Sequence, residues 1–547
     1  MKTDFWKLLT VAALAAAALS LSGCRKDNPN EEEEQRKADT TGYDHVIMYY
    51  TVGGGNLDDS QVADIVRAYK VISDEKIKNV AICGFYKPSA QFASEYPGVL
   101  RFSSAVNNAG GIGYDFKVDE DEPFAALKKV TTLELMDNSD AFVTGWEYLA
   151  KCIGLMKQEF PNGKKYTLVI SDHGGAFDYT DEMASCERNG IDTKAIMYSD
   201  ENSKGESLPA MGAATLVKAV RSAGVKFETL VTDACLMATQ ENIAEYSSQF
   251  GYAMLAAEVT YGDVMKSIVS ALSEAGPDAA KLRSAYKSVI DTYVSENADE
   301  STSFGFYDLS KTAEIQTIVA DFVEIAVEES KSLEGSVALG NAAGTTVCNA
   351  VADSTGVIDD WKEIREKILK GNKLSESDLD RIVEIEAGST CQFQLYDFIS
   401  NYCDQYAQLN PTGTSKLTTL QGIRDNYMKT LKEMAYINCT KTTADFNDPY
   451  VHTSITTNLY SLGKDAFKPW STENFNGNAL VNNLIDKGRL YSDYDEEDLE
   501  ACRQSLIAFI GTTALEKATS WGKLLQVLEI NPGIFTNPAR AFCENKN

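Results

Sequence analysis

The sequence predicts an α/β protein with a mainly parallel β-sheet flanked by helices, followed by a more helical C-terminal region. Short apolar runs, rich in β-branched and aromatic residues, alternate with segments of helical periodicity over residues 43–311. Strands separated by helical segments imply right-handed crossovers and a sheet that is covered on both faces. Long amphipathic runs dominate the rest of the chain, so residues 312–547 are expected to be mainly helical.

Five apolar runs are expected to form the strands of the sheet: residues 45–52, 79–85, 166–171, 227–232 and 252–257. Helical periodicity fills the intervals between these runs. It predicts a helix around residues 62–69, a second around 142–160, a third over 208–223 and a fourth from about 236 to 250.

Composition limits the classes of function. Hydrophobic residues make up 44% of the 547, which is enough to build substantial cores. A formal net charge of −29 repels phosphate groups, so a nucleic-acid partner is not expected. An acidic surface suits cationic peptides or calcium, although it is also common in exported proteins. The three histidines, at positions 45, 173 and 452, do not cluster with cysteines, so no Cys/His metal site is expected.

The N-terminus has the pattern of an export signal. Lysines precede an apolar, Ala- and Leu-rich run that is too short to span a membrane, and the run ends in Leu-Ser-Gly-Cys at residues 21–24. This junction resembles a bacterial lipobox, which predicts a signal peptide over residues 1–23 and a lipid on Cys24. The alternative is an ordinary signal with a chance cysteine.

Residues 24–42 are expected to be a flexible, acidic tether because they are too polar to be buried. They also resemble the acidic export tags of some bacterial surface lipoproteins. The sequence therefore predicts a lipid-anchored protein of the bacterial cell envelope. The export-tag resemblance extends this prediction to an outer-membrane protein that is exposed on the cell surface.

Two reactive side chains follow neighbouring strands of the expected sheet. His173 comes just after the third strand and Cys235 just after the fourth, at the edge where open α/β sheets carry their active sites. A cysteine needs a nearby base and proton donor for acyl transfer, and histidine commonly serves as both. A helix starting after Cys235 is expected to favour its thiolate. The backbone amides of Gly174 and Cys235 are the natural oxyanion donors.

Each of these residues also has a structural explanation. A lone cysteine after a strand is usually buried and inert, and a lone histidine there is usually satisfied by its surroundings. Their joint placement, with a glycine directly after His173, favours a catalytic pair.

The motifs around these residues resemble the clostripain family of cysteine peptidases, which have a caspase-like fold. An apolar strand leads to His-Gly at 173–174, and the next strand leads to Asp-Ala-Cys-Leu-Met-Ala at 233–238. The similarity covers roughly residues 44–311, with scattered matches beyond. Ser171-Asp172 before the histidine and Ala176-Phe177 after it depart from the family's pattern, so the resemblance supports the catalytic pair more strongly than a particular substrate preference.

The resemblance implies roles for several residues. His173 and Cys235 would form the catalytic dyad, and Asp233 would bind a basic side chain in the substrate pocket, with Asp263 as a second acidic residue there. An alternative role for Asp233 is to cap the following helix. Many members of the family cut themselves between the histidine and the cysteine after a basic residue, and the candidates here are Arg188, Lys194 and Lys204. No cofactor is implied as a requirement, although calcium dependence occurs in the family.

These observations predict an exported, lipid-anchored cysteine endopeptidase that cleaves protein or peptide substrates after Arg or Lys and is activated by self-cleavage. The alternative is a non-catalytic surface lipoprotein that uses the same fold to bind peptide or glycan. A transpeptidase is a third interpretation, because an amine can intercept an acyl-enzyme.

Overall fold

The computed structural model consists of two separate units, residues 1–37 and residues 38–547. All the residues that the structure describes lie in the second unit. They are residues 38–54, 57–92, 98–104, 123–130, 134–138, 140–175, 197, 204–206, 208–300, 302–353, 392–410, 415–440, 449–452, 455–458, 507–508 and 510–528.

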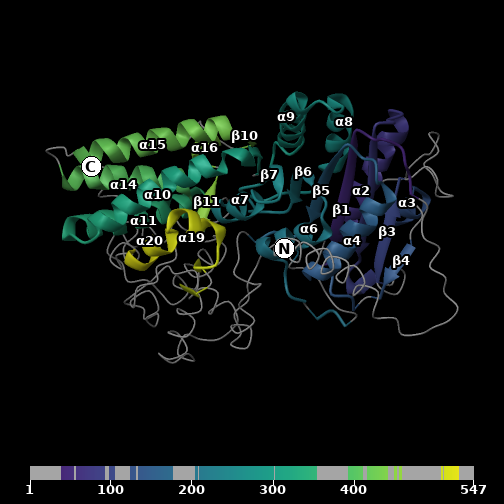
Figure 1. Ribbon diagram of the computed structural model, residues 1–547, viewed down its shortest axis with the longest axis horizontal. Coiled ribbons are helices and arrows are strands. Elements are labelled where there is room, and N and C mark those ends of the chain that lie inside the picture. The colour runs from purple at the N-terminus through teal and green to yellow at the C-terminus, as the bar shows by residue number, and fades with distance from the viewer. Residues whose placement is uncertain are drawn as a thin grey trace, which may run out of the picture. The chain divides into compact units, whose positions relative to one another are not determined.

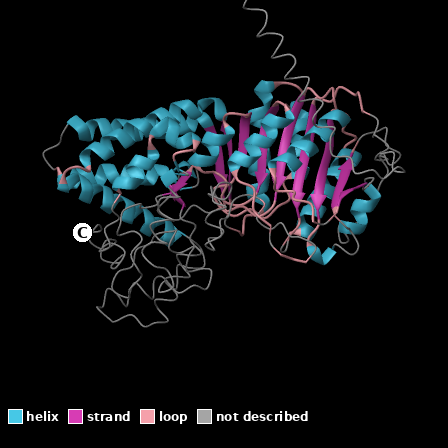
Figure 2. Cartoon of the chain, turned by 60° about the horizontal axis from the view of Figure 1, so that its bottom comes forward, coloured by secondary structure: helices cyan, strands magenta, loops and turns pink. Residues whose placement is uncertain are grey.

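The centre of this unit is a nine-stranded mixed sheet (Figures 1 and 2), with the strand order β10-β8-β7-β6-β5-β1-β2-β3-β4. Its strands are β1 (His45–Val52), β2 (Val80–Lys87), β3 (Val99–Ser103), β4 (Glu134–Asp137), β5 (Lys165–Ser171), β6 (Phe227–Asp233), β7 (Phe250–Leu255), β8 (Ser303–Asp308) and β10 (Ala435–Cys439). Strands β7, β6, β5, β1 and β2 are parallel and form the middle of the sheet.

The five strands expected from the sequence are these five parallel strands, so the predicted α/β class is confirmed. Four edge strands were not expected. Strands β3 and β4 extend one edge and β8 and β10 the other, all in antiparallel pairing. Strand β10 comes from the C-terminal region, which therefore contributes to the same sheet as the N-terminal half.

Helices cover both faces of the sheet, as expected of buried parallel strands. One face packs against α2 (Asp58–Asp74), α3 (Pro123–Val130), α8 (Met265–Ala275) and α9 (Ala279–Glu296). The other packs against α4 (Trp146–Glu159), α6 (Ala213–Ala223) and α7 (Gln240–Tyr246). Alternation along β1 serves both layers: Ile47 and Tyr49 enter the first core, and Val46 and Met48 the second.

Helices also dominate the described C-terminal region, as expected. They are α10 (Thr312–Glu329), α11 (Leu333–Asp353), α14 (Leu395–Leu409), α15 (Ser415–Met434), α16 (Pro449–His452), α19 (Ala514–Thr519) and α20 (Trp521–Val527). The 3-10 helices are η1 (Ala90–Phe92) and η2 (Leu309–Lys311). A small antiparallel sheet joins β9 (Gln392–Gln394) to β11 (Thr456–Asn458). The division between domains at residue 311 stays a prediction.

Two expected helices begin later than their apolar pattern indicated. The helix expected over residues 208–223 is α6, which begins at Ala213. The helix expected from Leu236 is α7, which begins only at Gln240, where the Thr239 hydroxyl caps it by accepting a hydrogen bond from the Asn242 amide. Residues 234–239 separate β6 from α7, and residues 235–239 of this stretch are here called the Cys235 loop. Four residues therefore separate Cys235 from the first residue of α7, so the expectation that the helix starts directly after the cysteine is wrong.

Candidate active site

The His173 and Cys235 segments leave neighbouring strands at the same edge of the sheet. Ser171 at the end of β5 pairs with Asp233 at the end of β6. Gly174 then lies against the backbone of Cys235 so closely that a Cβ at Gly174 would be 2.1 Å from the Cys235 carbonyl oxygen. The fold therefore brings the two predicted segments into contact.

Cys235 is partly exposed, and its sulfur is held by the loop that follows β7. The Thr260 backbone N–H donates a hydrogen bond to Sγ at 3.3 Å. The Thr260 carbonyl and hydroxyl oxygens both lie 3.9 Å from the same sulfur. This amide, which the sequence did not identify, is the polar contact that positions the thiol.

The backbone of the Cys235 loop is also hydrogen-bonded to the segment that follows β7. Leu236 has a φ of +65°, an uncommon conformation for a residue with a side chain. Its amide donates to the Glu258 carbonyl at 3.0 Å, and the Ala238 amide donates to the Ala256 carbonyl at 2.8 Å. These two bonds continue the pairing of β6 and β7 beyond the strands and offset the cost of the left-handed residue.

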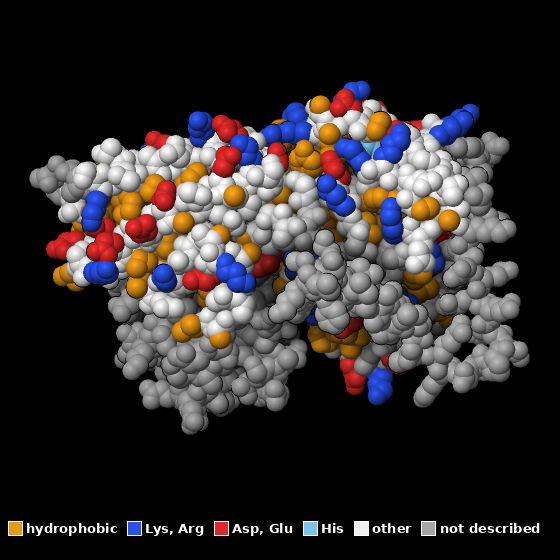
Figure 3. Space-filling view, viewed as in Figure 1, with side chains coloured by type: hydrophobic (Ala, Val, Ile, Leu, Met, Phe, Trp, Pro, Cys, Tyr) orange, Lys and Arg blue, Asp and Glu red, His pale blue; other side chains and the backbone are white. Residues whose placement is uncertain are grey.

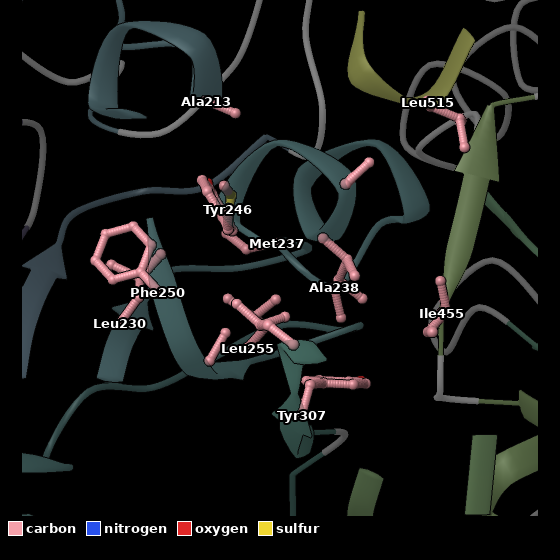
Figure 4. Close-up of a cluster of buried hydrophobic side chains, with 14 of the residues drawn as sticks. Ala213, Leu230, Met237, Ala238, Tyr246, Phe250, Leu255, Tyr307, Ile455 and Leu515 are labelled. Carbon is pink, nitrogen blue, oxygen red and sulfur yellow. The ribbon is translucent and has the colours of Figure 1, made fainter. Parts of the chain in front are cut away.

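An apolar cluster anchors the far side of the loop (Figure 4). It combines side chains from the loop with others from α7, β7 and the C-terminal region: Met237, Ala238, Tyr246, Phe250, Leu255, Ile455 and Leu515. Because these side chains are buried, the loop has little freedom to move Cys235.

His173 is partly buried and its main chain is tied down on both sides. Its amide donates to the Asp172 carboxylate, and its carbonyl accepts from the Met197 amide at 3.2 Å. These bonds fix the backbone from which the imidazole projects.

Asp233 lies at the end of β6, and its side chain is on the face covered by α2 and α8. The Ser171 hydroxyl donates to Oδ2 at 3.2 Å, whereas Oδ1 is buried without a hydrogen-bond partner among the described residues. Burial, with a smaller contribution from Asp263, raises the pKa of Asp233 to about 6. Because Thr239 caps α7, the alternative that Asp233 is a helix cap is wrong.

Asp263 follows β7 and has a left-handed φ of +66°. Its carboxylate forms an ion pair with the Arg67 guanidinium of α2, with Nη1 and Oδ2 3.1 Å apart. Burial raises the pKa of Asp263, and Arg67 opposes that rise. The two predicted acidic residues are thus near enough for their charges to interact, and one of them is already paired.

Comparison with known proteins decides the family. A model of the clostripain family matches residues 117–454, which is more than half of the chain and includes both His173 and Cys235. The chain belongs to the clostripain family of cysteine peptidases. No curated protein matches it.

Solved structures give distant similarities. A secreted cysteine protease from Bacteroides thetaiotaomicron, "iotapain", is 12% identical with a TM-score of 0.44, covering 76% of this peptidase and 92% of that chain. An inactive zymogen from Parabacteroides distasonis is 11% identical with a TM-score of 0.43 over the same shares. A Bacteroides thetaiotaomicron protease in complex with an irreversible peptide inhibitor is 14% identical with a TM-score of 0.36, covering 51% of this chain and 70% of that chain. These similarities are too remote to transfer residue roles.

A third acidic residue, which the sequence did not reveal, interacts with Asp233 and Asp263. Asp64 of α2 is buried, and its Oδ1 accepts a hydrogen bond from the Met265 amide at 3.0 Å. An acidic residue beside the apolar stripe of a buried helix is unusual in a sequence, and this pattern could have identified Asp64.

The remaining predicted residues are not part of this geometry. Lys204 is exposed, and Arg188, Lys194 and Cys24 lie outside the described residues. Within the described ranges, no group of three or more His, Cys, Asp or Glu side chains is placed to hold a metal ion. No described helix is long and apolar enough to cross a membrane. Acidic and basic side chains are interspersed on the face shown in Figure 3.

Proposed function

We propose that this peptidase is an endopeptidase with Cys235 as its nucleophile and His173 as its general acid and base. The observation that carries the proposal is the direct contact of Gly174 with the Cys235 backbone, because it sets the histidine segment beside the thiol. Cys235 is partly exposed, which is compatible with access of substrate to the thiol, and the Thr260 amide holds its sulfur.

The proposed reaction is acyl transfer in two steps. The Cys235 sulfur, after losing its proton to His173, forms a bond to the scissile carbonyl carbon, and the oxyanion is stabilised by the amides of Gly174 and Cys235. The C–N bond then breaks, and His173 returns the proton to the leaving amine. Water next attacks the thioester while His173 accepts its proton, and the C–S bond breaks to regenerate the thiolate.

The proposed specificity is for Arg or Lys on the amino side of the cleaved bond. Asp233 is buried two residues before Cys235 and keeps one carboxylate oxygen without a hydrogen-bond partner among the described residues, which is costly unless a cation binds there. Asp263 adds negative charge to the same region. A guanidinium or ammonium group of the substrate matches this site in charge and in hydrogen-bond donors.

Export, anchoring and activation are separate parts of the proposal. The Leu-Ser-Gly-Cys junction supports a lipid on Cys24 and an envelope location. If a Cys24→Ser variant remains wholly in membrane fractions, the anchor is elsewhere. Basic residues in the polar stretch between His173 and Cys235 support self-cleavage as the activating step. The proposed reaction requires no cofactor, and calcium remains a candidate ligand that a comparison of activity in EGTA and in added calcium tests.

The central test compares reporter peptides on the wild type and two variants. Cys235→Ala should abolish cleavage after Arg and Lys, and His173→Ala should lower kcat/KM by about 10²- to 10⁴-fold. Cys152→Ala is the matched control, because burial raises the pKa of that thiol and makes it unreactive. A wild type that neither turns over nor labels at Cys235 with a basic-residue electrophile would favour the binding-protein alternative.

A further inference from the structure

Helix α2 carries a row of polar side chains, and part of this row lies near Asp233 and Asp263, the acidic residues of the proposed substrate pocket. Gln61, Asp64 and Arg67 are spaced three residues apart, so they lie in one row along the helix. The Gln61 amide group donates to the Ser171 carbonyl at 3.2 Å, at the end of β5. At the other end of the row, Arg67 pairs with Asp263.

Asp64 occupies the middle of this row and is one of three carboxylates that interact there. Its exposed fraction is 1%. Oδ1 accepts from the Met265 amide, but Oδ2 is buried without a hydrogen-bond partner among the described residues. One oxygen of Asp233 and one of Asp263 are in the same condition. Burial and then repulsion from Asp233 and Asp263 raise the pKa of Asp64 well above its usual range.

The charge balance of this cluster is incomplete. Arg67 acts on Asp64 and Asp263, and Asp233 adds a third carboxylate, so full ionisation leaves excess negative charge in a mostly buried site, which is unfavourable. The described acidic residues are not placed to hold a metal ion. A larger organic cation with several N–H donors can reach oxygens that are farther apart.

We propose that Asp64 is a third carboxylate of the pocket that binds the basic side chain of the substrate, with Arg67 as the internal counter-charge of the empty pocket. This inference rests on the proposed specificity for Arg and Lys. The family match begins at residue 117, so α2 lies outside it and the assignment comes from this chain's own contacts.

Other ionisable groups also act on these carboxylates, and they come from the elements packed around α2. Besides Arg67, Asp233 and Asp263, they are Tyr49 of β1, Lys266 of α8, and Tyr293 and Glu296 of α9. Tyr49 and Tyr293 have pKa values raised by burial, so they are neutral at the pH of the test. Lys266 and Glu296 pair with each other at 3.2 Å. The proposed dyad of His173 and Cys235 acts on both reporters, so the effect of the carboxylates is the pH dependence of the ratio between the two values of kcat/KM.

The test measures kcat/KM against pH for two matched reporters, one with Arg and one with its neutral analogue citrulline at the cleaved bond. Asp64→Asn keeps an oxygen for the Met265 amide but removes the charge. It should lower the Arg-to-citrulline ratio about ten- to a hundredfold. It should also move the acid limb of the Arg-to-citrulline ratio, plotted against pH, to lower pH, because a negative charge beside the other two carboxylates is gone. Arg67→Gln should move that limb to higher pH, because a cation is gone.

Asp58→Asn is the matched control, since Asp58 is another buried carboxylate of α2 but bonds Tyr86 and the Ser89 amide instead. It should leave the ratio unchanged. If Asp64→Asn lowers the melting temperature but leaves both the ratio and the acid limb unchanged, Asp64 only caps α8 and the inference fails. If Asp64→Asn does not fold, Arg67→Gln decides the test. The inference is then overturned if Arg67→Gln leaves the acid limb at the pH of the wild type. A wild type without preference for Arg over citrulline removes the proposed specificity, and the inference with it.

Discussion

Gly174 is a residue at which the absence of a side chain is a steric requirement. A Cβ there would lie 2.1 Å from the Cys235 carbonyl oxygen and 2.7 Å from its amide nitrogen. Both contacts are to backbone that the Leu236 and Ala238 hydrogen bonds hold in place, so neither can relax cheaply. The glycine allows the chain after His173 to touch the chain at Cys235.

We therefore expect Gly174→Ala to separate the two segments. The variant should lose about 1–3 kcal/mol of unfolding free energy, as overpacked sites do. Its kcat/KM should fall about a hundredfold, because a displacement of about 1 Å in a catalytic pair has that effect. Thermal melts and reporter kinetics measure the two quantities. Gly154→Ala in α4 is the control, since no atom lies within 4 Å of its added Cβ. Full activity in Gly174→Ala would contradict the requirement for close contact.

The residues found from the sequence share one property, which is their position relative to a strand. His173, Cys235 and Asp233 stand at or just after buried apolar runs, and that position alone predicted their shared edge. Thr260 and Asp64 could not be found in this way. The Thr260 amide meets Cys235 only because a loop after β7 folds back, and Asp64 meets the Met265 amide only because α2 packs beside α8.

Among the elements, the parallel strands were predictable and the edge strands were not. The central runs are continuously apolar because both of their faces are covered. Strand β4 has only four residues, and β3 carries Arg101, whose guanidinium pairs with the buried Glu159 of α4 at 2.9 Å. Short or charged segments give no periodic signal, and their strand conformation depends on the partner that they pair with.

Strand β11 braces the Cys235 loop from the C-terminal region. The Thr456 amide donates to the Ala238 carbonyl at 3.0 Å, and Ile455 is buried in the apolar cluster of Figure 4. The Ile455 carbonyl in turn accepts from the Leu395 amide at the start of α14, at 3.1 Å. The C-terminal helices thus support the loop that carries the cysteine, although they are far from it in sequence.

Ile455→Ala should therefore affect catalysis as well as stability. Removing a fully buried Ile side chain costs about 2–5 kcal/mol of unfolding free energy. Because the lost contacts hold the Cys235 loop, kcat should also fall at temperatures well below the melting point. Leu420→Ala in α15 is the control: it removes an equally buried side chain and should lower the melting temperature while leaving kcat unchanged. Equal kcat values in the two variants would show that β11 does not support the loop.

At the scale of the whole molecule, the proposed self-cleavage falls between two adjacent strands of one sheet. Cleavage after Arg188, Lys194 or Lys204 would leave β1 to β5 on one fragment and β6 to β11 on the other. Strands β5 and β6 pair over five residue pairs, from Thr167 with Thr229 to Ser171 with Asp233. Both cores also contain residues from the two fragments, so cleavage would not expose either core.

The active enzyme should accordingly consist of two chains that stay together. Denaturing gels should show two fragments, gel filtration under native conditions should show one peak at the mass of the whole, and N-terminal sequencing should identify the cut after one of the three basic residues. Cys235→Ala should remain a single chain, as should a variant with Gln at all three positions. The fragments should separate only in denaturant, because the β5–β6 hydrogen bonds and the shared cores must be broken first. A fully active, uncut chain would exclude an activating cleavage. If the fragments separated in native buffer, the shared sheet could not be what holds them together.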